Sequence, residues 1–168
     1  MASIDASGPR SGAQEPLIRE FRPGDEAALA AVLGSAVHDL AKADYTPEQL
    51  AAWAPAVFDE ARWGERVRAL HPFVAEIEGT PVGYADLQPS GYIDHFFVTG
   101  THARRGIGSA LMARIEREAR ARGIAELFAN VSLTAERFFA RHGFLVEARQ
   151  VVVSRGVELA NARMRRRL

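Results

Sequence analysis

The sequence of 168 residues contains no cysteine, and this absence removes several kinds of chemistry at once. A chain without thiols cannot form disulfides, thiolate metal sites or a cysteine nucleophile. Five histidines are present, but none has the His-x-x-x-His spacing that brings two imidazoles together on a helix. We therefore expect no bound metal.

A surplus of one charge and a long apolar run are also missing. The 21 basic and 21 acidic residues give a formal net charge of +0, whereas nucleic-acid-binding proteins usually carry a basic surplus. No apolar run approaches the roughly 20 residues that span a bilayer, and the N-terminus lacks the apolar segment of a secretory signal. We expect no nucleic-acid partner, no membrane association and a cytoplasmic location.

Lysine is nearly absent, since Lys42 is the only lysine among the 21 basic residues. An excess of arginine together with abundant alanine is typical of a GC-rich bacterial genome. The length fits one ordinary domain, and a hydrophobic content of 48% is enough for a buried core. Residues 1–15 are small and polar, so we expect a disordered N-terminal tail there and a folded domain over residues 16–168.

The hydrophobic periodicity predicts a mixed α/β domain. Thr46, followed by Pro47 and Gln49, predicts a capped helix start, and Asp59 predicts another. Three strands separated by turn sequences, residues 73–77, 81–88 and 92–98, are predicted to form an antiparallel meander. The other elements are predicted by the same rules: helices over residues 25–38, 46–55, 59–70, 106–122 and 134–141, and strands over residues 17–21, 127–131, 144–153 and 157–164.

The most informative segment joins an aromatic strand to the longest predicted helix through residues 104–108, Arg-Arg-Gly-Ile-Gly. Glycines let a ligand approach the backbone closely. The free N–H groups and the dipole of a helix start favour negative charge at one point. The segment therefore predicts a phosphate or pyrophosphate site, and the alternative is a structural turn with two solvated arginines.

Two other phosphate-binding motifs do not fit these residues. A P-loop requires Gly-Lys-Ser/Thr, and Lys42 is far from this segment. A dinucleotide-binding fingerprint requires a third glycine where Leu111 stands. Glu126 lies at about the right distance for a ribose contact, but it begins the next predicted strand instead of ending it. A dinucleotide-binding oxidoreductase is therefore disfavoured.

Residues 104–111, RRGIGSAL, resemble the acyl-CoA motif of the GNAT acetyltransferase superfamily. Residues 132–144, SLTAERFFARHGF, are similar to its second motif, Asn-x-x-Ala-x-x-Phe-Tyr-x-x-x-Gly-Phe. The order of predicted elements matches from about residue 17 to residue 164. The resemblance, to single-domain bacterial members, implies a mixed, mostly antiparallel central sheet flanked by helices, with an acyl-CoA-binding strand, loop and helix. It also implies acetyl-CoA as the co-substrate.

The resemblance implies a CoA site in three parts. The strand before the loop pairs with pantetheine and polarises the acyl carbonyl, the loop and helix start hold the pyrophosphate, and the second motif completes the site. The residues implied are Phe96, Phe97, Val98, Arg104, Arg105, Gly106, Ile107, Gly108, Ser109, Ser132 and Phe139.

Three positions depart from the family pattern. Ala103 replaces a common Gln or Arg, and Ser132 replaces a common Asn while remaining a good helix cap. Phe139 stands where many members carry the tyrosine proposed to protonate the departing thiolate. Since phenylalanine has no proton to give, that role is absent or passes to Ser132, His142 or water.

Asp94 and His95 are the candidate bases, because both lie in the strand that leads to the loop. A carboxylate among aromatic residues is costly to bury without a partner. Asp94 is the first choice, acting directly or through water, with a structural carboxylate as the equal alternative. His95 has an ordinary pKa suited to proton transfer, although a lone strand histidine is more often a core residue.

The resemblance implies transfer of acetyl from acetyl-CoA to an amine of a small molecule or peptide. The alternative is a non-catalytic acyl-CoA-binding or sensor domain, suggested by Phe139. Four aromatic residues, Tyr45, Trp53, Phe58 and Trp63, form a stretch that either lines the acceptor pocket or packs in the core. Family members are often homodimers, and the sequence shows no interface.

Overall fold

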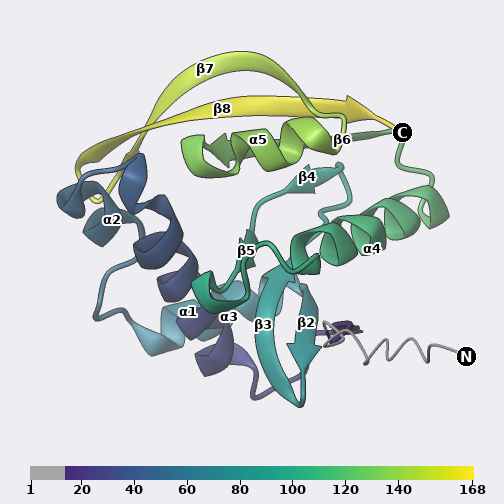
Figure 1. The fold of residues 1–168 in the computed structure, drawn as a ribbon, viewed down its shortest axis with the longest axis horizontal. Helices are drawn as coiled ribbons and strands as arrows, with labels where there is room; N and C mark the ends of the chain where they lie inside the picture. Colours follow the sequence, from purple (N-terminus) through teal and green to yellow (C-terminus); the bar gives the residue numbers. More distant parts are fainter. Residues whose placement is uncertain (1–13) are drawn as a thin grey trace, which may run out of the picture.

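The computed structural model describes residues 14–168, so the expected disordered tail lies outside the described residues except for its last two. The helices and strands follow one another in the predicted order, apart from a break in the third strand of the meander (Figure 1). The elements are β1 (Leu17–Glu20), α1 (Glu26–Ser35), α2 (Pro47–Trp53), α3 (Glu60–Leu70), β2 (Phe73–Ile77), β3 (Thr80–Ala85), β4 (Tyr92–Ile93), β5 (Phe96–Val98), α4 (Ile107–Ala121), β6 (Glu126–Ser132), α5 (Leu133–Arg141), β7 (Leu145–Ser154) and β8 (Val157–Arg167).

The capping residues fix the helix starts as the sequence predicts. At α2 the Gln49 amide N–H donates to Thr46 Oγ1 over 3.3 Å, and the Thr46 N–H donates to Gln49 Oε1 over 2.9 Å, which completes a capping box. Asp59 caps α3 by accepting the Arg62 N–H over 3.0 Å. The first predicted helix changes pitch, because α1 continues as a π-helical turn over Ala36–Leu40.

The strands form two four-stranded sheets, with orders β1-β2-β3-β5 and β4-β6-β8-β7. The predicted antiparallel pairing of β2 with β3 is confirmed, but the prediction of one continuous strand over residues 92–98 is wrong. The chain breaks after β4, which pairs in parallel with β6, and β5 pairs with β3.

Asp86 explains the break in the predicted strand. Its side chain is fully buried, and Oδ1 accepts the backbone N–H of Asp94 over 3.0 Å and of His95 over 2.7 Å. These two amides bind a carboxylate instead of a neighbouring strand, so the chain leaves one sheet and enters the other. Beyond Ile93 and Ala129, no strand of residues 14–168 lies between β5 and β6, which form the two sides of a wedge that we call the β5–β6 wedge.

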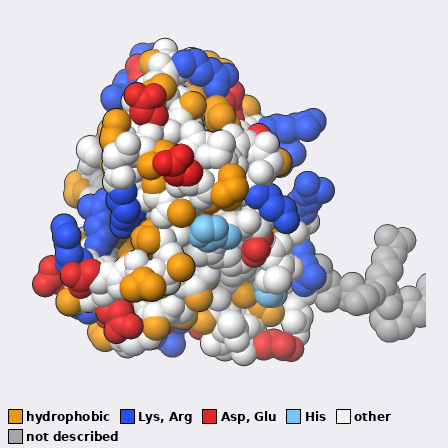
Figure 2. Space-filling view, turned by 90° about the vertical axis from the view of Figure 1, so that its left-hand side faces the viewer, with side chains coloured by type: hydrophobic (Ala, Val, Ile, Leu, Met, Phe, Trp, Pro, Cys, Tyr) orange, Lys and Arg blue, Asp and Glu red, His pale blue; other side chains and the backbone are white. Residues whose placement is uncertain are grey.

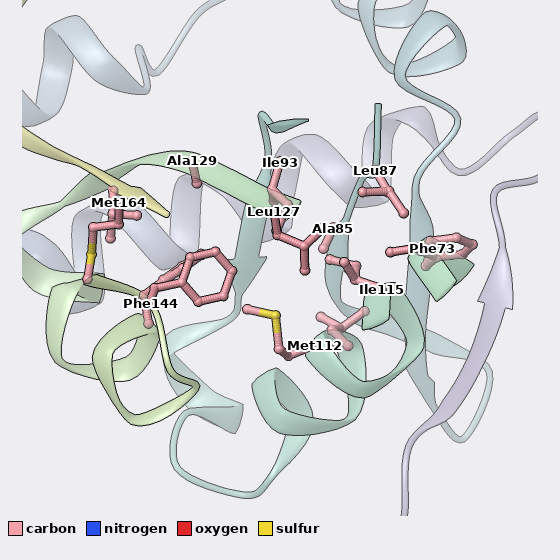
Figure 3. Close-up of a cluster of buried hydrophobic side chains, with 14 of the residues drawn as sticks. Phe73, Ala85, Leu87, Ile93, Met112, Ile115, Leu127, Ala129, Phe144 and Met164 are labelled. Atoms are coloured by element: carbon pink, nitrogen blue, oxygen red, sulfur yellow. The ribbon is translucent and has the colours of Figure 1, made fainter. Parts of the chain in front are cut away.

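Helices cover both faces of the strands. The buried face of α4 packs on residues of β2, β3 and β6, as shown by Met112 and Ile115 beside Phe73 and Leu127 in Figure 3. A second cluster joins α1 and α3 to the other face of β2 and β3. Both clusters bury apolar side chains against the sheet, which fixes β5 and the start of α4 in position.

Candidate functional site

The β5 strand presents unpaired backbone groups to the β5–β6 wedge. On its other edge, Asp86 N donates to His95 O over 3.1 Å and Thr99 N donates to Val82 O over 2.9 Å. Since backbone groups alternate in direction along a strand, Phe97 faces β3 as well, whereas Phe96 and Val98 face the wedge. Of the backbone groups expected to contact pantetheine and the acyl carbonyl, those of Phe96 and Val98 are free to do so.

The loop and the start of α4 form a concentration of unpaired donors. The first intrahelical hydrogen bond runs from Ala110 N to Gly106 O over 2.9 Å, so the N–H groups of Ile107, Gly108 and Ser109 have no acceptor in their own helix. Arg104 and Arg105 are exposed, and within residues 14–168 neither forms an ion pair. The predicted phosphate-binding residues therefore lie together at the positive end of one helix.

Glycine is needed at the positions of this segment for different structural reasons. Gly106 adopts φ +82°, and a Cβ there would meet nothing within 4 Å, so backbone conformation is what requires glycine. A Cβ on Gly108 would lie 3.1 Å from the ring of Phe138, so glycine there permits α4 to pack on α5. Gly100, which the motif did not single out, has the tightest packing of the three: its Cβ would lie 2.5 Å from Asp39 Cβ.

An aromatic cluster joins β5 to α5. The ring of Phe96 lies 5.3 Å from that of Phe138 and 5.5 Å from that of Phe139, measured between centroids. Phe139 is only 3% exposed and also contacts Phe144 at 5.0 Å. The His142 ring lies 4.5 Å from that of Phe138 at an interplanar angle of 50°, and its Nε2 lies 3.3 Å from Ser109 Oγ. The cluster thus couples the helix carrying the second motif to the loop carrying the first.

Ser132 lies where β6 ends and caps α5. Its Oγ accepts the Ala135 N–H over 3.2 Å, and its own hydroxyl proton has no acceptor among residues 14–168. Tyr45 is nearby, but its hydroxyl accepts from Leu133 N over 3.0 Å and donates to Ala160 O over 2.7 Å. Tyr45 therefore ties α5 to β8, while Ser132 has a proton to donate.

Asp94 occupies the break between β4 and β5. Its carboxylate, 22% exposed, pairs with the guanidinium of Arg66 on α3 and accepts from the Tyr92 hydroxyl over 3.3 Å. Asn130 of β6 donates to the same hydroxyl over 3.4 Å. Asp94 is thus a partly buried carboxylate held at the root of the wedge, with both a hydroxyl donor and a cation beside it.

His95 is held in one tautomer by Tyr84. The Tyr84 hydroxyl is fully buried, burial raises its pKa, and its only hydrogen-bond partner in the described chain is His95 Nδ1 at 3.0 Å. Donation from the tyrosine to Nδ1 gives its buried hydroxyl proton an acceptor, and this arrangement places the proton of neutral His95 on Nε2. Burial lowers the pKa of His95 to about 4, an effect that the charge of Asp94 only partly offsets, so the imidazole is neutral at pH 7.

Asp86 is the functional residue that sequence reasoning missed. Burial raises its pKa, although hydrogen bonds from the His95 amide and from Gln88 Nε2, at 2.5 Å, act in the opposite direction. Its contribution is to position the backbone of both candidate bases. The available signal was a lone acid within the apolar run of residues 81–87.

A pocket of about 230 Å³ opens on the face of β5 opposite α4. His95 and Phe97 form its floor, and three of the four predicted aromatic residues, Trp53, Phe58 and Trp63, form its walls; Tyr45 does not contribute. The remaining lining residues are Ala30, Leu33, Gly34, Ala54, Pro55, Arg66 and Arg155. We call this cavity the inner pocket.

Comparison with known proteins agrees with this geometry. Residues 41–166 match the family described as acetyltransferase (GNAT) domain. An uncharacterized N-acetyltransferase of Escherichia coli K12, YafP, is 37% identical over 148 residues, covering 88% of this chain and 93% of that protein. A GCN5-related N-acetyltransferase of Rhodopseudomonas palustris superposes with a TM-score of 0.89 at 33% identity, covering 95% of this chain and all of that one.

The chain therefore belongs to the GNAT acetyltransferase family, and its expected fold and acetyltransferase activity are confirmed. The structure of YncA from Salmonella typhimurium with acetyl-CoA shares the fold at a TM-score of 0.67 and 24% identity, over 92% of this chain and 95% of that one. Within residues 14–168 no group of three His, Asp or Glu side chains is placed to hold a metal ion. No helix in that range has the length and apolar character needed to cross a membrane.

Proposed function

We propose that acetyl-CoA binds along the β5–β6 wedge and that its acetyl group passes to an amine held in the inner pocket. The observation that carries this proposal is the break after Ile93, which opens the wedge beside the unpaired N–H groups of α4. The wedge accepts an extended chain such as pantetheine, and the helix start accepts its pyrophosphate. Arg104 and Arg105 add side-chain charge to the same phosphate site.

The acyl carbonyl lies against the free backbone of β5. The N–H of Val98 or Phe96 donates to the carbonyl oxygen and stabilises the negative charge that develops during attack, as in an oxyanion hole. These donors are fixed by the pairing of β5 with β3, so they need no reorganisation when the charge appears. Side-chain identity contributes little to this step.

Asp94 accepts the proton of the attacking amine, directly or through water. Aliphatic amines are mostly protonated at pH 7, since their ordinary pKa values are about 8–10.4, so attack requires a proton acceptor. His95 is poorly suited to the role, because the Tyr84 hydroxyl occupies Nδ1 and Nε2 carries a proton. The departing thiolate leaves as such or takes a proton from Ser132 or water, since Phe139 offers none.

The test measures binding and turnover separately. Calorimetric titration with acetyl-CoA measures affinity, and thiol release with a panel of amines measures transfer. The variant Asp94→Asn is expected to reduce turnover roughly 10²-fold with nearly unchanged acetyl-CoA affinity. Glu65→Gln is the matched control, because Glu65 is an exposed acid on α3 beside Arg66.

Normal turnover in the Asp94→Asn variant would move the base elsewhere. A protein that binds acetyl-CoA but releases no thiol with any amine would favour the sensor function instead. The cytoplasm, where acetyl-CoA is made and used, is the location we propose for this reaction. A homodimer is compatible with the site, which is built entirely from one chain.

A further inference from the structure

The polar side chains that line the inner pocket share one property: they are hydrogen-bond donors. No Asp or Glu occurs among its lining residues, which include two arginines and His95. The carbonyl of Ala54, another lining residue, is already occupied by His38 Nε2 at 2.7 Å. The tautomer set by Tyr84 leaves an N–H on His95 Nε2, which has no other partner among residues 14–168. A pocket of this kind is complementary to a ligand rich in acceptor oxygens.

The two arginines differ in their pairing. Arg66 is neutralised by Asp94, as described above. Arg155 forms no ion pair within residues 14–168, so its charge at the wall of the inner pocket is not matched by a carboxylate. Arg155 is exposed, and an uncompensated cation beside an apolar cavity favours an anionic ligand through charge-assisted hydrogen bonds.

The structural role of Arg155 does not account for an arginine at this position. Its Nη1 donates to Ala52 O over 2.6 Å, but Ser154 Oγ already donates to the same carbonyl over 3.0 Å. Arg155 also adopts φ +48° in the turn between β7 and β8, a conformation that favours glycine or asparagine. The bond to Ala52 holds the guanidinium beside the pocket and leaves its other N–H groups free.

The surface around the inner pocket does not itself favour an anionic ligand. On the side of the molecule that carries α1 and α2, acidic, basic and hydrophobic side chains are interspersed (Figure 2). The open groove next to the inner pocket is lined by Glu26 and Glu60 as well as Arg68. Selection for an anion must therefore come from the inner pocket and not from the field outside it.

We infer that the acetyl acceptor is a small amine that carries a carboxylate on an apolar body, and that Arg155 selects the carboxylate. Trp53, Phe58 and Trp63 enclose the apolar body, and the amine lies toward Asp94 and the wedge. The volume of about 230 Å³ is below the roughly 300–1,000 Å³ of sites for drug-sized ligands, as expected for a molecule of amino-acid size. This inference rests on the proposed function, because it assigns the substrate class of the same site.

The experiment compares matched pairs of acceptors: phenylalanine with phenylalaninamide, and leucine with leucinamide. Thiol release from acetyl-CoA gives kcat/KM for each. We expect the carboxylates to be preferred by about tenfold, the effect of one charge-assisted contact. Ionisation of the amine works against this preference, since a neighbouring carboxylate stabilises the ammonium form.

Arg155→Gln is expected to abolish the preference by lowering kcat/KM for the carboxylates about tenfold while leaving the amides nearly unchanged. Arg155→Lys, which keeps the positive charge, should retain part of the preference for the carboxylates. Arg117→Gln, an exposed arginine on α4 without an ion pair in the described chain, controls for net charge. Thermal unfolding of each variant tests whether the substitution destabilises the turn between β7 and β8.

Equal or better use of the amides by the wild type, or a preference that survives in Arg155→Gln, would overturn the inference. In both cases thiol release with the neutral amines would leave the proposed function standing. If none of the amines gave thiol release although acetyl-CoA bound tightly, both the inference and the proposed function would be overturned.

Discussion

Acid should destabilise this protein through His95, and the effect can be isolated by one substitution. The pKa of His95 falls from 6.5 to about 4 on folding, because burial disfavours the imidazolium. A difference of this size corresponds to about 3 kcal/mol between the two protonation states. The substitution His95→Gln removes the titration and keeps an amide oxygen that can accept from Tyr84.

The sign of this pH dependence is set by whether the unfolded or the folded protein binds the proton at the higher pH. As the pH falls below 6.5 the unfolded chain protonates His95 while the folded protein does not, so the free energy of unfolding decreases until the pH reaches about 4. Asp86 acts in the opposite direction: its raised pKa contributes stability that is present in acid and lost as the pH rises. Because Asp86 is present in both proteins, the comparison of wild type with His95→Gln cancels its contribution.

The assay is urea unfolding, followed by the fluorescence of Trp53 and Trp63, at intervals from pH 8 to pH 4.5. Relative to the His95→Gln variant, the wild type is expected to lose about 2.5 kcal/mol over this range. His71→Asn, a change at an exposed histidine that caps α3 in a left-handed conformation, is the control and should show no such difference. Parallel pH profiles for wild type and His95→Gln would refute the assignment of a buried, neutral imidazole.

Two further predictions concern the CoA side of the site. Gly108→Val places a branched side chain against the Phe138 ring, so we expect acetyl-CoA affinity to fall about tenfold or more by calorimetry; unchanged affinity in a folded variant would count against the phosphate site. Phe139→Tyr puts a hydroxyl into a buried cluster, so it should lower the free energy of unfolding by about 1–3 kcal/mol and change turnover less than tenfold. A large gain in turnover would instead indicate that the wild type is an incomplete catalyst.

Local sequence determined what could be predicted. The helix starts at Thr46 and Asp59 depend on contacts within three residues, so the capping residues predict them directly. The phosphate loop is equally local, because its glycines and the first turn of α4 lie in one segment. The resemblance to the family implied that the two motifs belong to one site, and the structure brings Ser109 Oγ of the first within 3.3 Å of His142 Nε2 of the second.

The parts that could not be predicted depend on long-range contacts. The break between β4 and β5 requires Asp86 to bind amides eight and nine residues further along the chain. Alternation alone could only assign Asp94 and His95 to opposite faces of an unbroken strand. The tautomer of His95 likewise depends on Tyr84, a partner on a neighbouring strand that no local pattern identifies.

The turn between β7 and β8 also has a consequence for the order in which the molecule matures. Ser154 and Arg155 bond to Ala52 across sequence separations of 102 and 103 residues, and Figure 1 shows the hairpin arching across to α2. Closing so long a loop costs more chain entropy than forming the neighbouring contacts of α4 and β5. A chain emerging from the ribosome therefore forms the loop and α4 before the contacts that hold Arg155 beside the inner pocket. Because β8 also pairs with β6, the second sheet is completed and Arg155 is placed beside the inner pocket in the same last step of synthesis.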